Sequence, residues 1–285
     1  MALTGLEERV QNPKAKVLCT GSFPLGNRTF RCWKQQGHGM VDMYEAIVQS
    51  CDVYFYNLGR KLDPDRVASL ERDIGLGVLT GVELPGEKSG LVPDTFWKRE
   101  VKKGQWHEYE SVLLGIGQGA IHVSPLGLLS GYAAIATGGE VMRPRLVSRM
   151  IRMDGSVEEF PPQRLRRLPW KPANVAFIHR ALKGVVNDFG TGGAAKLPGV
   201  EVGGKTGTAQ IVTIKGKMVK SEDLPYEIRD HAWFVGFSPV SDPEICVVAL
   251  VEHGGHGGSA AAPVVKSVMQ EYFRLKQVAE EGEGV

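Results

Sequence analysis

The sequence has almost no excess of charge of either sign. Its 34 lysines and arginines nearly balance its 32 aspartates and glutamates, which leaves a net charge of +2 over 285 residues. No basic block is mixed with aromatic residues, as a nucleic-acid-binding surface requires. With 42% hydrophobic and 23% charged residues, the composition is that of a globular protein that can bury a sizeable core. We therefore expect no nucleic-acid partner.

Long hydrophobic runs are also scarce. Residues 111 to 139 carry no Lys, Arg, Asp or Glu, a length that is sufficient to cross a bilayer. This stretch is rich in glycine and contains Pro125, so it predicts a buried loop that leads into a core helix. No basic region followed by an apolar run and a small-residue cleavage site opens the chain, so no signal peptide is recognised.

Apolar spacing and turn residues predict the order of the elements. In the first third of the chain we expect a helix within residues 1 to 10, a hairpin at 16 to 34 centred on Gly26 and Asn27, a helix at 41 to 62 with a break near Ser50, and a helix at 63 to 73. A turn-rich connector at 80 to 94 follows, then strand and loop at 141 to 166 and a helix at 172 to 187. The last elements are neighbouring strands at 232 to 237 and 245 to 251 and a helix at 261 to 278. Residues 1 to 278 are expected to form one domain, and 279 to 285 a disordered tail.

Two short segments carry chemically informative residues. In GKTGTAQ, Lys205 and Thr206 offer a cation and a hydroxyl that together can hold a carboxylate, and Gly207 would let an extended peptide pair with the strand. A lysine in a glycine-rich turn explains the tripeptide equally well. In the second segment, Ser50 and Asp52 flank Cys51 at a helix end, where they can relay a proton or simply cap the helix.

Together and in this order, the two segments resemble the second and third motifs of the penicillin-binding protein and serine β-lactamase superfamily, which are S-x-N or S-x-D, and K-T-G. TGVELPGEKSGLVPD, the GIGQG of residues 115 to 119, KTGTAQ and HAWFVGFSP extend the likeness from about residue 1 to 275. They are similar to the elongation class of class B penicillin-binding proteins (penicillin-binding protein 2), for which aspartate at the third position of Ser50-Cys51-Asp52 is typical.

The resemblance implies a peptidoglycan D,D-transpeptidase of the elongation machinery, which cross-links stem peptides by serine acyl transfer and is bound covalently by β-lactams. It implies catalytic roles for Ser50, Asp52, Lys205 and the Thr208 N–H, the last as one half of an oxyanion hole. Lys205, Thr206, Gly207 and Thr208 would bind the substrate. A membrane glycosyltransferase is the implied protein partner, and the periplasmic face of the bacterial inner membrane is the implied location. No organic cofactor is expected.

The first motif of the superfamily, S-x-x-K, is absent from this sequence. No serine is followed three residues later by a lysine. In the family, the helix that carries S-x-x-K continues into a segment similar to MALTGLEE, so we expect the missing lysine a few residues before Met1. We therefore expect an N-terminally truncated domain that lacks the nucleophile, the general base and the membrane anchor, and is inactive by itself.

Three of the four cysteines lie close to a histidine, as Cys19-x12-Cys32-x5-His38-x12-Cys51. Three thiolates and an imidazole are a tetrahedral zinc set, and four protein ligands make such a site structural. A disulfide between Cys19 and Cys32, or free thiols, are the alternatives. The hairpin register places Cys32 opposite Gly21 and Cys19 opposite Lys34, an offset that favours ligands for a metal. Some elongation-class members hold zinc with residues in corresponding places.

The predicted fold class is α/β, of the penicillin-binding and serine β-lactamase type. An antiparallel sheet built mainly from the C-terminal strands is flanked by helices, and an all-helical part meets the sheet edge at Lys205. Two alternatives remain open. One is a β-lactamase or β-lactam sensor of the same fold, and the other is a non-catalytic module that binds peptides or a partner. The coding sequence upstream of Met1 distinguishes an enzyme from a pseudoenzyme, because only the enzyme has S-x-x-K there.

Overall fold

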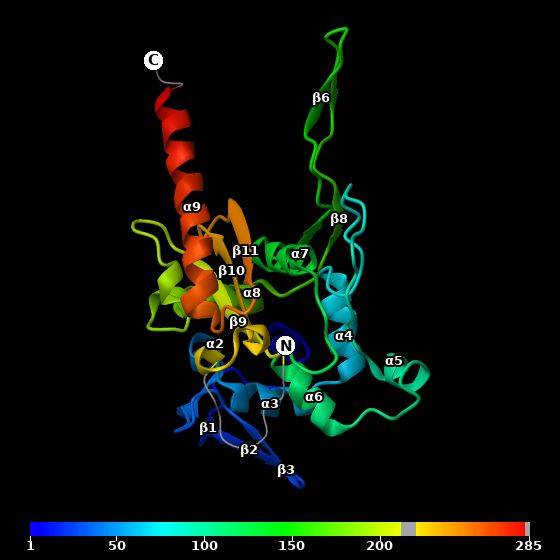
Figure 1. The fold of residues 1–285 in the computed structure, drawn as a ribbon, viewed down its shortest axis with the longest axis vertical. Helices are drawn as coiled ribbons and strands as arrows, with labels where there is room; N and C mark the ends of the chain where they lie inside the picture. The colour runs from blue at the N-terminus through cyan, green and yellow to red at the C-terminus, as the bar shows by residue number, and fades with distance from the viewer. Residues whose placement is uncertain (212–220, 283–285) are drawn as a thin grey trace.

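A three-stranded antiparallel sheet lies at the centre of the molecule (Figure 1). The computed structural model describes residues 1–211 and 221–282. The strands are β9 (Gly203–Ala209), β10 (His231–Ser238) and β11 (Ile245–Val251), in the order β11-β10-β9. Both pairings are antiparallel, and they run over the full length of β10. The predicted antiparallel sheet of C-terminal strands is thus confirmed.

Helices cover both faces of this sheet. On one face, Ala232 and Phe234 of β10 are buried against α9 (Gly257–Gly282). On the other face, Phe237 packs with α8 (Pro172–Asn187), where its ring lies 5.4 Å from that of His179. Helix α7 (Pro125–Ala136) contacts β10 and β11. Alternate side chains of a strand point to opposite faces, so a segment buried on both faces is apolar throughout, as residues 232 to 237 of β10 are.

The remaining helices form the all-helical part below the sheet in Figure 1. Their order along the chain is α1 (Ala2–Glu7), α2 (Met43–Val48), α3 (Asp52–Lys61), α4 (Pro64–Asp73), α5 (Thr95–Glu100) and α6 (Glu108–Gly115). The predicted break near Ser50 is confirmed, since it separates α2 from α3. Helices α3 and α6 touch through their backbones, because a Cβ on Gly59 would lie 2.4 Å from the carbonyl oxygen of Ser111.

The charge-free stretch at 111 to 139 divides between the end of α6, a loop and α7. In the described part of the chain, no helix combines the length and the hydrophobicity needed to cross a membrane.

The N-terminal strands form two small ribbons. In the hairpin of β2 (Ser22–Leu25) and β3 (Arg28–Arg31), Leu25 pairs with Arg28 as predicted, and the N–H of Cys32 donates to the carbonyl of Gly21. The expected position of Cys19 opposite Lys34 is wrong. Strand β1 (Val17–Cys19) pairs instead with β4 (Gly39–Val41), which puts Cys19 opposite Gly39. Gly21, at φ +89°, turns the chain out of the hairpin, and a Cβ there would lie 2.0 Å from the carbonyl oxygen of Gln35.

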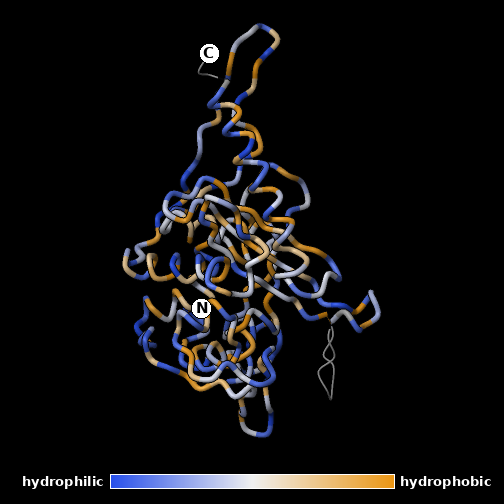
Figure 2. Tube along the Cα trace, turned by 90° about the vertical axis from the view of Figure 1, so that its left-hand side faces the viewer, coloured by the Kyte–Doolittle hydropathy of each residue, from blue (hydrophilic) through white to orange (hydrophobic). Residues whose placement is uncertain are grey.

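A narrow arm projects from the body, next to α7 (Figure 1). Its base pairs β5 (Glu140–Met142) with β8 (Arg164–Arg167), and its outer part pairs β6 (Arg149–Ile151) with β7 (Val157–Glu159). Figure 2 shows polar and apolar residues mixed along the arm. Short 3₁₀ turns complete the described chain: η1 (Gly193–Ala195), η2 (Ser221–Asp223) and η3 (Tyr226–Ile228).

The C-terminal helix is longer than the sequence predicts. Helix α9 includes residues 279–282, which were expected to belong to a disordered tail, while 283–285 lie outside the described residues. Side-chain pairs one turn apart support the extension: Lys276 lies 3.9 Å from Glu280, and Gln277 donates to Glu281 at 2.9 Å. Such pairs stabilise the exposed end of a helix, which the tail's composition alone did not indicate.

The first turn of α9 is pressed against the sheet, and this contact predicts the effect of one substitution. A Cβ on Gly257 would lie 2.1 Å from the carbonyl oxygen of Trp233 and 2.5 Å from that of Gly207. We expect Gly257→Ala to lower the free energy of unfolding by roughly 1–3 kcal/mol, because backbone atoms must shift. Gly193→Ala is the matched control, since its Cβ would meet nothing closer than the Val186 oxygen at 3.9 Å. Equal denaturation midpoints for the two variants would contradict this packing.

Candidate active site and metal centre

Ser50 occupies a conformation that usually requires glycine. Helix α2 ends in a Schellman motif, in which the N–H of Cys51 donates to the Ala46 carbonyl at 2.9 Å and that of Ser50 donates to the Ile47 carbonyl at 3.3 Å. Ser50 follows the C-cap with φ +53°, in the left-handed region. A residue with a Cβ pays about 1–2 kcal/mol there. Ser50 therefore adopts this conformation at an energetic cost, and its hydroxyl points to the sheet.

The structure brings Lys205 of β9 to this hydroxyl. The Lys205 ammonium donates to Ser50 Oγ at 2.8 Å, to the Thr206 carbonyl at 3.2 Å and to Thr206 Oγ1 at 3.3 Å. An ammonium has three donors, so all of them are engaged. Burial lowers the pKa of Lys205 to about 8, against the attraction of Asp52, which raises it. A bound anion would thus meet a cation that is held in place, and it would replace one of these three acceptors.

Asp52 is the first residue of α3, and its carboxylate is bound by the loop between β3 and β4. Its Oδ2 accepts the main-chain N–H of Trp33 at 2.8 Å. Burial raises the pKa of Asp52 to about 7, and the negative charge of Cys32 adds to this, while Trp33 and Lys205 act in the opposite direction. Ser50 and Asp52 therefore flank the start of α3, with Lys205 facing them from the sheet.

Strand β9 places Thr206, Gly207 and Thr208 at an edge of the sheet. Among the described strands, only β10 pairs with β9, so no described strand pairs with its other edge. An extended peptide can add to such an edge by main-chain hydrogen bonds. The first residue of α9, Gly257, lies against the main chain of Gly207, since a Cβ on Gly257 would be 2.5 Å from the Gly207 carbonyl oxygen.

Three residues that sequence reasoning did not assign also hold the site. The Thr191 hydroxyl lies 2.9 Å from Thr206 Oγ1, and the Gln118 amide donates to the Thr208 carbonyl at 2.8 Å. Trp33 binds the main chain around Ser50. Gln118 lies in the GIGQG segment and Trp33 follows the candidate ligand Cys32, so both lie in or next to a segment recognised from the sequence. No comparable signal marks Thr191.

The four candidate metal ligands converge from the end of β1, the loop between β3 and β4, and the residue before α3. The sulfurs of Cys19, Cys32 and Cys51 and a ring nitrogen of His38 all lie within 4.8 Å of one another. His38 Nδ1 is 3.6 Å from Cys19 Sγ and 3.5 Å from Cys32 Sγ. The three cysteines are buried and form no disulfide, so the alternative Cys19–Cys32 bridge is not formed here.

This donor set fits a zinc ion. Tetrahedral ligands at zinc distances lie about 3.6 Å from one another, which is close to the sulfur–nitrogen separations given above. Nδ1 of His38 faces the sulfurs, while Nε2 is buried and has no hydrogen-bond partner among the described atoms. The four residues supply a complete coordination shell, so a metal here would have no open position for a substrate.

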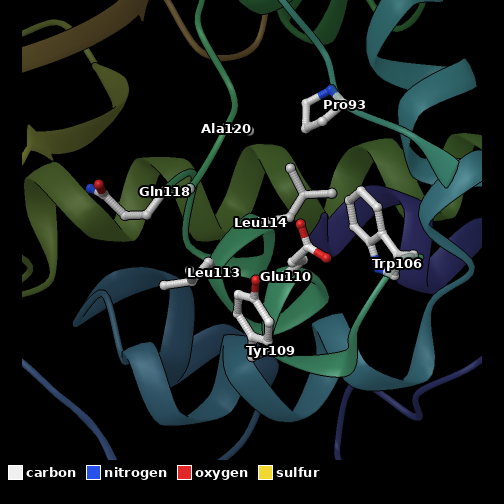
Figure 3. A pocket seen from close by; sticks show the side chains of 9 residues that line it. Pro93, Trp106, Tyr109, Glu110, Leu113, Leu114, Gln118 and Ala120 are labelled. Carbon is white, nitrogen blue, oxygen red and sulfur yellow. The ribbon is translucent and has the colours of Figure 1, made fainter. Parts of the chain in front are cut away.

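A pocket of about 210 Å³ lies beside the site, in the all-helical part (Figure 3). Its wall is mainly apolar, with Trp106, Leu113 and Leu114 around the carboxylate of Glu110. That carboxylate is neutralised by Lys98 at 2.7 Å. Neither Ser50 nor Lys205 lines this pocket, and only Gln118 joins it to β9. The chemistry-bearing residues therefore lie at the sheet edge and not in this cavity.

Comparison with known proteins agrees with this arrangement. Residues 1–270 match the penicillin binding protein transpeptidase domain family. The chain is 36% identical over 270 residues to the peptidoglycan D,D-transpeptidase MrdA of Acinetobacter baumannii, covering 91% of this chain and 39% of that protein. It is 33% identical to MrdA of Haemophilus influenzae, covering 98% of this chain and 44% of that protein. The chain thus spans well under half the length of these relatives.

Solved structures give the same result. PBP2 of Pseudomonas aeruginosa in complex with WCK 5153 superposes with a TM-score of 0.81 at 34% identity, over 95% of this chain and 58% of that one. PBP2 of Helicobacter pylori, in a complex with MreC, superposes with a TM-score of 0.80 at 28% identity, over 96% of this chain and 48% of that one. With Ser50 and Lys205 joined at the sheet edge, the chain belongs to the penicillin-binding protein transpeptidase domain family, in its PBP2/MrdA branch.

Proposed function

We propose that this chain forms the larger part of a D,D-transpeptidase domain that cross-links peptidoglycan during cell-wall elongation. The observation that carries the proposal is the bond from Lys205 to Ser50 beside the edge of β9 that no described strand pairs with. Two motifs of the family, far apart in the sequence, meet there as the reaction requires. Relatives named peptidoglycan D,D-transpeptidase support the same activity.

Each site residue has a role in substrate binding, in proton transfer or in stabilising the transition state. Lys205 and Thr206 bind the terminal carboxylate of a stem peptide or of a β-lactam, and Gly207 leaves the main chain of β9 accessible to the peptide. Ser50 Oγ accepts from Lys205 and passes a proton toward the leaving group, while Asp52 positions the substrate. The N–H of Thr208 is one half of an oxyanion hole, a contact that lowers the barrier by about 3 kcal/mol.

The reaction is acyl transfer in two steps. A serine hydroxyl attacks the carbonyl of the penultimate D-alanine, the peptide bond breaks, and the terminal D-alanine leaves as an amine that takes up a proton. An amine of a second stem peptide then attacks the ester, which releases the serine with its proton. The attacking serine is not among the 285 residues, which contain no S-x-x-K. We propose that it precedes Met1 in the complete domain.

The relatives also suggest partners and a location. One neighbouring structure is a PBP2 complex with MreC, and another describes a peptidoglycan synthase complex that coordinates polymerization and crosslinking. By analogy, we propose that the protein works with a membrane glycosyltransferase of the elongation machinery, at the periplasmic face of the bacterial inner membrane. Stem peptides are its substrates, and β-lactams are its covalent inhibitors.

The cluster of Cys19, Cys32, His38 and Cys51 is proposed to bind one structural zinc ion. The match of the sulfur–nitrogen separations to a zinc tetrahedron supports this. Bound zinc would supply a cross-link between the ribbon at β1 to β4 and the start of α3. Because Cys51 lies between Ser50 and Asp52, that link fixes both active-site residues.

The zinc proposal predicts the metal content of variants. Chain purified without added metal is expected to hold about one zinc, since four protein ligands form a closed site. Cys32→Ser should lower the content to near zero and reduce the thermal midpoint, while Cys246→Ala, at the cysteine outside the cluster, should retain the metal. Elemental analysis with thiol titration is the measurement. A zinc ratio near zero with two thiols missing would instead establish a disulfide.

The buried ammonium predicts how peptide binding depends on pH. Lys205, whose pKa burial lowers to about 8, carries its charge below that pH and loses it above. The carboxylate of a D-alanyl-D-alanine peptide stays ionised throughout, with a pKa of about 3.5. We expect the affinity to fall by about tenfold per pH unit above pH 8, measured by NMR titration. Lys205→Arg should abolish this dependence, since a guanidinium stays charged. An unchanged slope in that variant would assign the titration to another group.

The proposed activity predicts which form of the protein reacts with penicillin. We expect the intact mass of this chain to be unchanged after incubation with excess penicillin, because it contains no S-x-x-K serine. The same chain, extended by the coding sequence that precedes Met1, should gain the mass of one penicillin. An adduct on the shorter chain would identify an unrecognised nucleophile, and no adduct on either form would refute the proposed transpeptidase.

A further inference from the structure

Trp33 has an unusual combination of exposure and hydrogen bonding. Trp33 is 49% exposed, so it is not a core residue. Its indole Nε1–H donates to the carbonyls of Gln49 at 3.1 Å and Ser50 at 2.9 Å. Its main-chain N–H donates to Asp52 Oδ2 at 2.8 Å. All three bonds reach the short segment between α2 and α3.

The indole bonds meet a specific need of that segment. The last carbonyls of a helix have no partner within the helix. Ser50 stands in the left-handed region, at φ +53°, where a residue other than glycine needs support from its surroundings. An indole has a single N–H, which the Gln49 and Ser50 carbonyls share, so no indole donor competes with Lys205 for the Ser50 hydroxyl. The hydroxyl therefore remains directed to Lys205.

The other side of Trp33 is tied to the Cys and His cluster. Trp33 directly follows Cys32, whose N–H is fixed by the Gly21 carbonyl at 2.9 Å. The indole lies edge-on to the His38 ring, with 5.5 Å between ring centroids. Two members of the cluster thus determine where the indole can lie.

We propose that Trp33 is a positioning residue, whose indole N–H holds the Ser50 main chain so that the hydroxyl reaches Lys205. Through Trp33, this geometry also depends on the cluster of Cys19, Cys32, His38 and Cys51. The inference rests on the proposed function only for its consequence in substrate binding. A role in packing alone would bury the ring and would be served equally by phenylalanine.

The test reads the Lys205–Ser50 contact directly, through the ¹³Cε resonance of Lys205. Ser50→Ala supplies the reference shift for a lysine without its hydroxyl partner. Trp33→Phe should move the resonance in the same direction. Replacement of Trp33 by 3-benzothienylalanine, which keeps the ring shape but has no N–H, should do the same even where phenylalanine disturbs packing. Trp97→Phe is the control, because Trp97 lies on α5 and faces Lys102 instead.

Peptide affinity supplies the functional readout. With N-acetyl-D-alanyl-D-alanine as the probe, we expect both Trp33 replacements to bind about 3- to 10-fold more weakly, the range expected for one lost hydrogen bond. An unchanged Lys205 resonance in the benzothienyl form overturns the proposal. Weaker binding without that shift overturns it too, since Trp33 would then touch the ligand itself.

The dependence on the cluster has its own variant. Cys19→Ser alters the cluster without changing a neighbour of Trp33 in the sequence, and it should shift the Lys205 resonance in the same direction. An unchanged resonance in Cys19→Ser overturns this part of the inference. If the wild-type chain binds no peptide at all, the proposed function fails, while the resonance test of Trp33 still gives an answer.

Discussion

The structure depends on one hydrogen bond, from the Lys205 ammonium to the Ser50 hydroxyl at 2.8 Å, which joins residues 155 positions apart. It is the point at which the all-helical part meets the sheet. Ser50 reaches it only because α2 ends in a left-handed residue, and Lys205 reaches it only because β9 is the edge strand. The conformational cost at Ser50 and the burial of the Lys205 charge are both consequences of this contact.

Close contacts between backbones place the elements on either side of that bond. Gly257 brings the first turn of α9 onto the main chain of Gly207, and Gly59 brings α3 onto α6. A side chain at Gly257 or Gly59 would displace one of these elements. Lys205 lies in β9, and Ser50 lies just before α3. The contacts therefore set the spacing between these two residues.

The N-terminal segment from β1 to β4 also supports the site. Through Trp33 and the buried cysteines, it holds the start of α3 from the side opposite the sheet. Ser50 and Asp52 are thus fixed from two directions, by Lys205 of the sheet and by the N-terminal strands and their loops. Support of this kind is how a site is kept in one geometry while a ligand enters and leaves.

The sequence alone determined the local features: the break at Ser50, the β2–β3 register, the strands around Lys205 and the four candidate metal ligands. Each of these follows from periodicity, turn residues or motif spacing, which neighbouring residues decide. Only the tertiary structure decided the pairing of Cys19 with Gly39, the close approach of Gly257 to Gly207, and the contacts of Trp33, Gln118 and Thr191. These depend on the approach of segments far apart in the chain, and the energy of such contacts is not encoded in any one segment.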